Sequence, residues 1–277
     1  MKKHINTPLF ILSLLGLLSF YGCNSGDMVL FSIEDDKALG LQVSNQVDST
    51  YRAKGQLLER NSNDQNVSTA YTHLDRIVDR ILNSGEIQYK DEFKWTIKII
   101  EDKETQNAFA TPGGYIYVFT GLLQYLDDED HFAGVLAHEI AHADQRHGVK
   151  QLQKSYGISL LLSIVLGNES GALEQIVGQL TGTLAGLQFS RSAEAEADAY
   201  SVAYLAGTDY YTCDGAAGFF IKLNQDAAQG NPPEFLSTHP NPENRIQEIE
   251  ILAQDRNCTT TTAADSDFAA LKRALNL

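Results

Sequence analysis

Apolar residues recur at helical spacing through the first part of the chain, with polar breaks between the repeats. Residues 35–60 carry apolar side chains about every three or four positions, which predicts an amphipathic helix. The polar run 61–66 ends this pattern, and a second amphipathic helix is expected to follow and to end at Ser84-Gly85. Residues 93–100 instead alternate apolar and polar side chains, as a half-buried strand does.

A turn, a second strand and a long helical region follow. Pro112-Gly113-Gly114 predicts a turn, and Tyr115–Phe119 is rich in the β-branched and aromatic residues of strands. Helices are then expected at 120–126, 130–147, 149–166, 170–188, 191–207, 213–228 and, after a proline break, 242–254. The tail 257–267 is expected to be loose and to lead to a short helix at 268–275. The pattern predicts an α+β, mostly α fold.

The apolar run 158–166 is a candidate for a membrane-spanning segment by its composition. It is about half as long as the roughly 20 residues that a span requires. A buried or groove-lining helix is therefore expected there.

The N-terminus has the pattern of an export signal. Lys2-Lys3 precede an apolar run, 9–21, that is too short for an ordinary membrane span. The run ends at Gly22-Cys23, and a small residue before a cysteine resembles the processing site of bacterial lipoproteins. We therefore expect a signal peptide at 1–22, a lipid on Cys23 and a tether at 23–35. Ordinary secretion, with cleavage a few residues later, is the alternative.

Charge and cysteine content narrow the class of protein. Removal of the two signal lysines takes the net charge from −15 to −17, which argues against nucleic-acid partners. The roughly 255 remaining residues suffice for one domain, expected at 36–256, with a C-terminal tail at 257–277. In an oxidising compartment Cys213 and Cys258 could pair; two free thiols are the alternative.

An H-E-x-x-H segment, from His138 to His142, lies in the helix expected at 130–147. Four residues advance a helix by about 400°, so both imidazoles leave the same face one turn apart. Two such imidazoles can hold one Zn²⁺, and Glu139 can take a proton from a water that the metal activates. A helix that carries these residues by chance is the alternative. The segment indicates a zinc hydrolase.

A catalytic zinc usually has three protein ligands, so a third must lie elsewhere. On a continuous helix His147 would lie about 180° from His138, and it is expected to interact with a helix C-terminus instead. Glu194 and Asp198 share a helix face, whereas Glu196 points roughly the opposite way. Glu194 is the candidate third ligand, and Asp198 is a candidate acceptor for the free ring N–H of a ligating histidine. A solvated acidic helix has the same pattern.

Together these motifs resemble those of the HtpX-like zinc metallopeptidases, a family that includes the CaaX prenyl endopeptidases. The similarity covers about residues 36–254 and is strongest to the soluble, periplasmic BepA-like branch. It rests on the H-E-x-x-H, on Arg146-His147 after it, on Ser190-Arg191-x-x-Glu194-x-x-x-Asp198, on Thr238-His239-Pro240 with Arg245-Ile246, and on the segment 110–123.

The resemblance implies a helical zincin-type metalloprotease domain whose small sheet precedes the active-site helix. It implies Zn²⁺ on His138, His142 and Glu194, Glu139 as general base and acid, and polypeptide substrates such as misfolded envelope proteins. His239 has three open interpretations. It could close the metal's fourth position in a latent enzyme, it could stabilise the oxyanion together with Arg245, or it could have no role.

Gly114, Tyr115, Ile116 and Tyr117 are expected to bind substrate if the second strand has an open edge, to which an extended peptide can add by backbone pairing. An ordinary core strand is the alternative. Two rival functions remain open at this point. One is a periplasmic chaperone or scaffold with a structural or occluded zinc site, and the other is a zinc hydrolase of non-peptide material such as cell wall. The expected location is the periplasm, with a lipid anchor to an envelope membrane.

Overall fold

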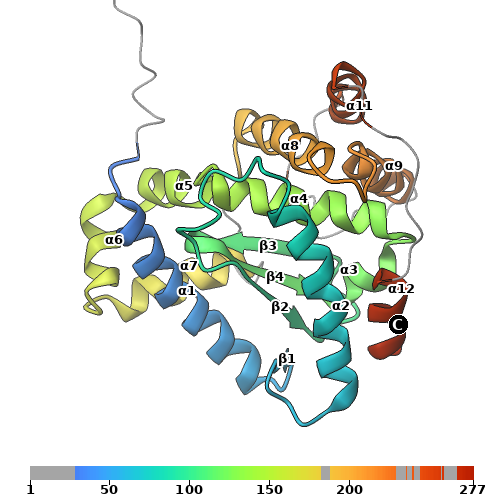
Figure 1. Cartoon of the computed structure of the whole chain (residues 1–277). Helices are drawn as coiled ribbons and strands as arrows, with labels where there is room; N and C mark the ends of the chain where they lie inside the picture. The colour runs from blue at the N-terminus through green and yellow to red at the C-terminus, as the bar shows by residue number, and fades with distance from the viewer. Residues whose placement is uncertain are drawn as a thin grey trace, which may run out of the picture.

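The computed structural model describes residues 29–181, 188–228, 235, 239, 244–256, 258 and 267–277. Its centre is a four-stranded sheet in the order β1-β2-β4-β3 (Figure 1). The strands are β1 (Leu57–Leu58), β2 (Thr96–Ile100), β3 (Ala108–Thr111) and β4 (Tyr115–Phe119). β2 and β4 are parallel, and both outer pairs are antiparallel. Helices surround this sheet, so the mostly α, α+β prediction is confirmed.

A tight turn joins the antiparallel strands β3 and β4. Pro112–Gly114 forms one turn of 3₁₀ helix, in which Gly113 has φ 73° and Gly114 has φ 89°. Residues that carry a Cβ atom rarely adopt such positive φ values, so the two glycines allow the chain to reverse direction here. The predicted turn is confirmed.

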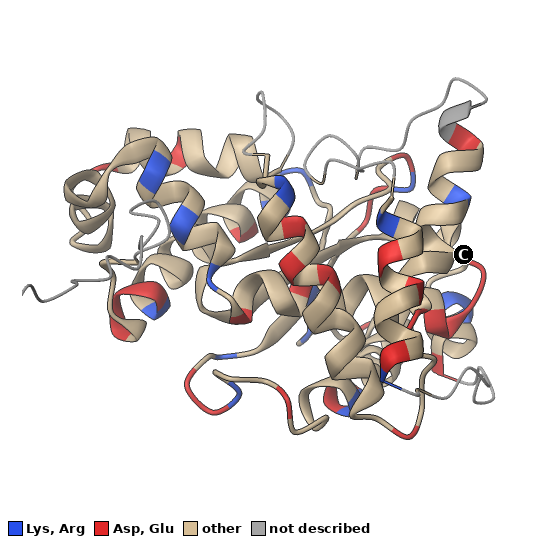
Figure 2. Cartoon of the chain, turned by 90° about the horizontal axis from the view of Figure 1, so that it is seen from above, with Lys and Arg blue, Asp and Glu red and all other residues tan. Residues whose placement is uncertain are grey.

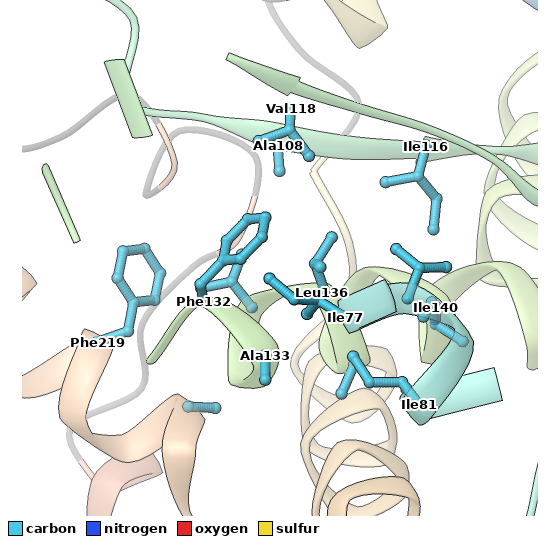
Figure 3. Close-up of a cluster of buried hydrophobic side chains, with 14 of the residues drawn as sticks. Ile77, Ile81, Ala108, Ile116, Val118, Phe132, Ala133, Leu136, Ile140 and Phe219 are labelled. Carbon is cyan, nitrogen blue, oxygen red and sulfur yellow. The ribbon is translucent and has the colours of Figure 1, made fainter. Parts of the chain in front are cut away.

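Side-chain alternation along β4 supplies both faces of the sheet. Ile116 and Val118 join the apolar cluster on the α2 and α4 side, where Figure 3 shows them facing Leu136 and Ile140 of α4. Tyr115, Tyr117 and Phe119 point to the other face and pack with α1, α5, α6 and α7. Every residue of β4 is buried. The strand is therefore a central core strand.

Eleven helices have bounds within the described residues. They are α1 (Ile33–Ala53), α2 (Gln65–Leu82), α3 (Thr120–Tyr125), α4 (Glu129–Asp144), α5 (His147–Tyr156), α6 (Ile158–Val165), α7 (Ser170–Leu180), α8 (Arg191–Ala206), α9 (Gly215–Ala228), α11 (Arg245–Asp255) and α12 (Asp267–Ala274). In Figure 1, α4 lies between β3 on one side and α8 and α9 on the other, so it crosses the core.

Several predicted helices are wrong in their extent. The helix expected at 35–60 ends at Ala53, because Gly55 has φ 69° and the chain then enters β1. The helix expected at 149–166 is broken into α5 and α6 at Gly157, which has φ 76°. β1 and β3 were not predicted, since two residues are too few to show a period and β3 is buried on both faces.

The two ends of the described chain pack against the domain. α1 begins at Ile33, within the segment expected to be a tether, and Ser32 and Asp35 form a capping box there. The short C-terminal helix expected at 268–275 is present as α12, which packs against α2. Buried Asp267 receives hydrogen bonds from Arg80 and Arg76.

Within the described ranges, no single helix is long and apolar enough to cross a membrane, although α6 and α7 satisfy the length and composition criteria as a pair bent by 105°. α6 buries Leu161 and Ile164 against α1, as expected for a buried helix, while Leu162 and Leu166 are exposed. Figure 2 shows acidic and basic residues interspersed on the described helices, in keeping with a chain of net charge −15.

Candidate metal centre

α4 carries the first two candidate ligands into the middle of the protein. Asp128 caps it by accepting a hydrogen bond from the His131 backbone N–H at 2.9 Å. Gly134 permits close packing on α9, because a Cβ there would lie 2.2 Å from the backbone nitrogen of Ala216. His138, Glu139 and His142 follow one to two turns later and are at most 1% exposed.

Four buried side chains converge beside this helix: His138, His142, Glu194 and His239. The Nε2 atoms of His138 and His142 are 2.9 Å apart. The Glu194 carboxylate lies 3.4 Å from His138 Nε2 and 3.5 Å from His142 Nε2. His239 Nδ1 lies 3.1 Å from Glu194 and 3.4 Å from His138 Nε2.

These separations suit a tetrahedral zinc. With bonds of about 2.0–2.1 Å, ligand atoms of such a site lie roughly 3.3 Å from one another. Three imidazoles and one carboxylate are also donor types that zinc accepts. The residues present therefore fit the ion.

The protonation states that the pocket favours suit metal binding only in part. Burial lowers the pKa of His142 well below its ordinary value, so this imidazole is neutral. Burial opposes ionisation of Glu194, but the neighbouring imidazoles hold its pKa well below the ordinary range. Burial also lowers the pKa of His138, yet hydrogen bonds to Asp198 and Glu194 raise it to about 9. A metal must therefore displace a proton from His138.

Asp198 and Arg245 surround the candidate ligands with a buried ionic network. His138 Nδ1 lies 2.9 Å from Asp198 Oδ1, the acceptor position expected from the sequence. Arg245, the first residue of α11, donates from Nε and Nη2 to both oxygens of Asp198, at 2.6 and 2.8 Å. Its Nη2 also lies 2.9 Å from Glu194, and its guanidinium stacks over Phe220. Arg245 thus holds two carboxylates in place.

Glu139 lies directly beside the cluster. It is fully buried, and its Oε1 is 3.4 Å from Nε2 of His239, whose other ring nitrogen faces the candidate ligands. Burial raises the pKa of the Glu139 carboxyl, which makes the group a stronger base. This is the position that a general base beside a metal requires.

The prediction that His147 ends a helix and interacts with its C-terminus is wrong. α4 ends at Asp144, Arg146 takes a left-handed conformation with φ 59°, and His147 begins α5 instead of ending a helix. It is 2% exposed, and its Nδ1 lies 3.0 Å from Nδ1 of His142. Its Nε2 lies 3.1 Å from Glu196, the acidic residue that faces away from Glu194.

Phe189 was not anticipated from the sequence. Its ring stacks on the imidazole of His142 at a centroid distance of 4.0 Å. It also lies 5.5 Å from the ring of His239. A lone phenylalanine just before a helix carries no sequence signal of such a role.

The expectation that β4 offers an open edge for substrate is wrong. β4 is paired on both sides, with β2 and β3, so the backbone at Tyr115, Ile116 and Tyr117 is already hydrogen-bonded, and Gly114 lies in the turn before it. The outer strand beside α4 is β3. A strand's position in a sheet depends on pairing with distant segments, which a single strand does not reveal.

The two downstream cysteines, Cys213 and Cys258, are joined by a disulfide. It links the segment before α9 to Cys258, three residues beyond the end of α11, so the loop that it closes contains both His239 and Arg245. Cys23, Thr238 and Pro240 lie outside the described residues.

The sequence profile of peptidase family M48 matches residues 69–253, about two thirds of the chain and every candidate ligand. The chain belongs to peptidase family M48. This confirms the resemblance predicted from the motifs. Peptidases of family M48 are zinc-dependent, and the four-residue cluster fits a zinc site.

Several M48 relatives are similar over the same region. The mitochondrial metalloendopeptidase OMA1 of Schizosaccharomyces pombe is 32% identical over 64% of this chain and 51% of its own length. The beta-barrel assembly-enhancing proteases of Yersinia pestis and Escherichia coli are 31% and 30% identical over 62% of this chain and 37% of theirs. The chain thus spans between about a third and a half of these relatives.

Proposed function

We propose that this chain is a zinc-dependent endopeptidase that cleaves misfolded or misassembled proteins of a bacterial cell envelope. The observation that carries the proposal is the convergence of His138, His142 and Glu194 on one point, with Glu139 buried next to them. A purely structural zinc site has no use for a carboxylate base beside the metal. The substrate class follows the names of the beta-barrel assembly-enhancing relatives.

Zinc bound here supplies Lewis-acid chemistry, which activates water and polarises a peptide carbonyl. The residues of this chain do the rest. Glu139 takes a proton from the attacking water and delivers it to the nitrogen of the leaving amine. Asp198 holds the ring of His138 by accepting its Nδ1–H, and Arg245 fixes Asp198 through two hydrogen bonds.

In this proposal, His239 would hold the fourth position of a bound zinc in the resting protein. Its Nδ1 points at the other three ligands, and its Nε2 contacts Glu139, so one ring engages both the metal site and the base. A catalytic zinc needs an open fourth position for water. His239 must therefore move before a substrate can be cleaved.

The variant His239→Ala tests this role. If the imidazole blocks the site, its removal raises the rate of peptide cleavage at unchanged zinc content. A decrease in kcat would instead support hydrogen bonding to the oxyanion, and wild-type kinetics would remove His239 from the mechanism.

The outer strand β3 is proposed to bind the substrate backbone. The Phe119 N–H donates to the Asn107 carbonyl. Because hydrogen-bonded pairs alternate along antiparallel strands, the backbone groups of Phe109 and Thr111 also face β4. The backbone groups of Ala108 and Ala110 then point away from β4, and the Ala110 N–H lies beside Glu139. An extended peptide that pairs with Ala110 would be held next to the base.

N-methylation of a cleaved peptide tests this pairing without altering the enzyme. A series of peptides carries one methyl group each, on successive backbone nitrogens. Methylation of every second nitrogen is expected to abolish cleavage of the peptide. Equal tolerance at all positions would exclude strand pairing.

Export and lipid attachment belong to the same proposal. The N-terminal pattern and the disulfide both suit an oxidising compartment. Expression with a labelled fatty acid is expected to label the wild type but not Cys23→Ser. Labelling of both proteins, or of neither, would remove the lipid anchor from the proposal.

The decisive experiment compares casein cleavage by the wild type with cleavage by Glu139→Gln, together with zinc analysis of both proteins. The variant keeps the size of the side chain and removes the base, so we expect bound zinc and no cleavage. Equal cleavage by the wild type and Glu139→Gln would favour the rival function of a chaperone with an occluded zinc. The absence of cleavage by all three proteins, including His239→Ala, would favour it too.

A further inference from the structure

The two imidazoles on α4 are supported in different ways. His138 reaches a carboxylate directly, because its Nδ1 lies 2.9 Å from Asp198. Among the residues that the structure describes, no carboxylate lies at Nδ1 of His142. Another imidazole stands there, with Nδ1 of His147 at 3.0 Å. Behind it, Nε2 of His147 lies 3.1 Å from Glu196.

The positions of the protons in this series follow from the chemistry of the first ligand. His142 directs Nε2 at the candidate ligands, so as a neutral ligand it carries its proton on Nδ1. That N–H can donate only to an unprotonated Nδ1 of His147. The proton of His147 must then be on Nε2, where Glu196 accepts it. Each group has a suitable partner.

The fold places His147 by means of a strained corner. Arg146 is one of two non-glycine residues with positive φ among the described residues. Its guanidinium donates to the buried carboxylate of Asp36 at 2.9 Å and to the Phe31 carbonyl at 2.6 Å. These bonds hold a conformation that a side chain otherwise disfavours. At this corner the chain changes direction between α4 and α5, which places His147 beside His142.

We propose that His147 and Glu196 are positioning residues that orient His142 for zinc through a carboxylate–imidazole–imidazole relay. The proposal rests on the zinc site of the proposed function, because it concerns how one ligand of that site is held. Glu194, Glu196 and Asp198 of α8 then have three different tasks: a ligand, the end of the relay, and the direct partner of His138.

Zinc affinity, measured by competition with a chromophoric chelator, tests the relay without reference to peptide cleavage. His147→Leu removes the acceptor for His142, and we expect affinity to fall on the order of 10- to 100-fold, as is usual when such a partner is lost. His147→Asn keeps a side-chain oxygen near the former Nδ1 and is expected to restore most of the loss.

Glu196→Ala tests the far end of the relay, and Glu92→Ala is the matched control. The Glu196 side chain is 45% exposed, so its removal leaves the core intact. Glu92 is also exposed and lies in the loop before β2. We expect Glu196→Ala to weaken zinc binding by a smaller factor than His147→Leu and Glu92→Ala to have no effect.

The absorption spectrum of the Co²⁺-substituted protein separates positioning from folding. A displaced imidazole changes the intensity of the visible bands even when the protein is folded and loaded. Wild-type affinity and spectrum in both His147→Leu and Glu196→Ala would overturn the relay while leaving the proposed function intact. If His147→Leu does not fold, Glu196→Ala decides by the same criteria. A wild type that binds no zinc would overturn both proposals.

Discussion

The disulfide between Cys213 and Cys258 should stabilise the part of the protein that completes the metal centre. The two cysteines are 45 residues apart in sequence, and the segment between them contains His239 and Arg245. In the chain-entropy model, closing a loop of this length stabilises the folded state by ~4 kcal/mol. For a domain of this size, that corresponds to a fall in unfolding midpoint on the order of 10 °C when the bond is removed.

Thermal unfolding of the wild type and of the double variant Cys213→Ser/Cys258→Ser, each with and without reductant, measures this contribution. Only the wild type should respond to reductant, and its reduced midpoint should approach that of the variant. Zinc should also dissociate at a lower temperature from the variant, because α11 then lacks its C-terminal link. If the oxidised wild type is no more stable than the double variant, the disulfide does not stabilise the folded state.

Three further predictions concern packing, acid stability and metal. Gly134→Ala should destabilise the protein by about 1–3 kcal/mol in urea unfolding, because its Cβ would overlap Ala216, whereas Gly148→Ala meets no atom within 4 Å and should be neutral or slightly stabilising. Burial raises the pKa of Asp267, but hydrogen bonds that include one from Arg76 lower it below the ordinary 3.8. Its contribution to stability is therefore present above about pH 4 and lost as the pH falls through the lowered pKa, a loss that Asp267→Asn should reduce in acid unfolding. Chelation of zinc should lower the unfolding midpoint in proportion to RT ln(1 + [Zn]/Kd), and an unchanged midpoint would argue against binding to the native state.

Local patterns in the sequence were enough to predict the parts of the site that lie on one helix face. His138 and His142 are one turn apart, as are Glu194 and Asp198, and both pairs lie on one face in the structure. Helical periodicity depends only on the backbone geometry of neighbouring residues, so it survives in the sequence. The turn at Pro112–Gly114 was predictable for the same local reason.

The relay behind His142 was not predictable from periodicity. On a continuous helix His147 would face away from His138. Only the left-handed conformation of Arg146, which is held by Asp36 from 110 residues earlier in the chain, returns His147 to the site. A non-glycine residue adopts such a conformation when distant contacts offset its cost. The sequence shows no sign of those contacts.

Strand order was likewise decided by tertiary structure. Tyr115–Phe119 was predicted as a strand from its composition, but whether it lies at an edge depends on β2 and β3 pairing with it from both sides. β3 itself, Ala-Phe-Ala-Thr, is covered on both faces and shows no alternation. Motifs in the sequence were sufficient to identify which residues could bind zinc and act as base. The tertiary structure decided which backbone edge lies beside them and which side chains hold them, because those relations join segments far apart in the chain.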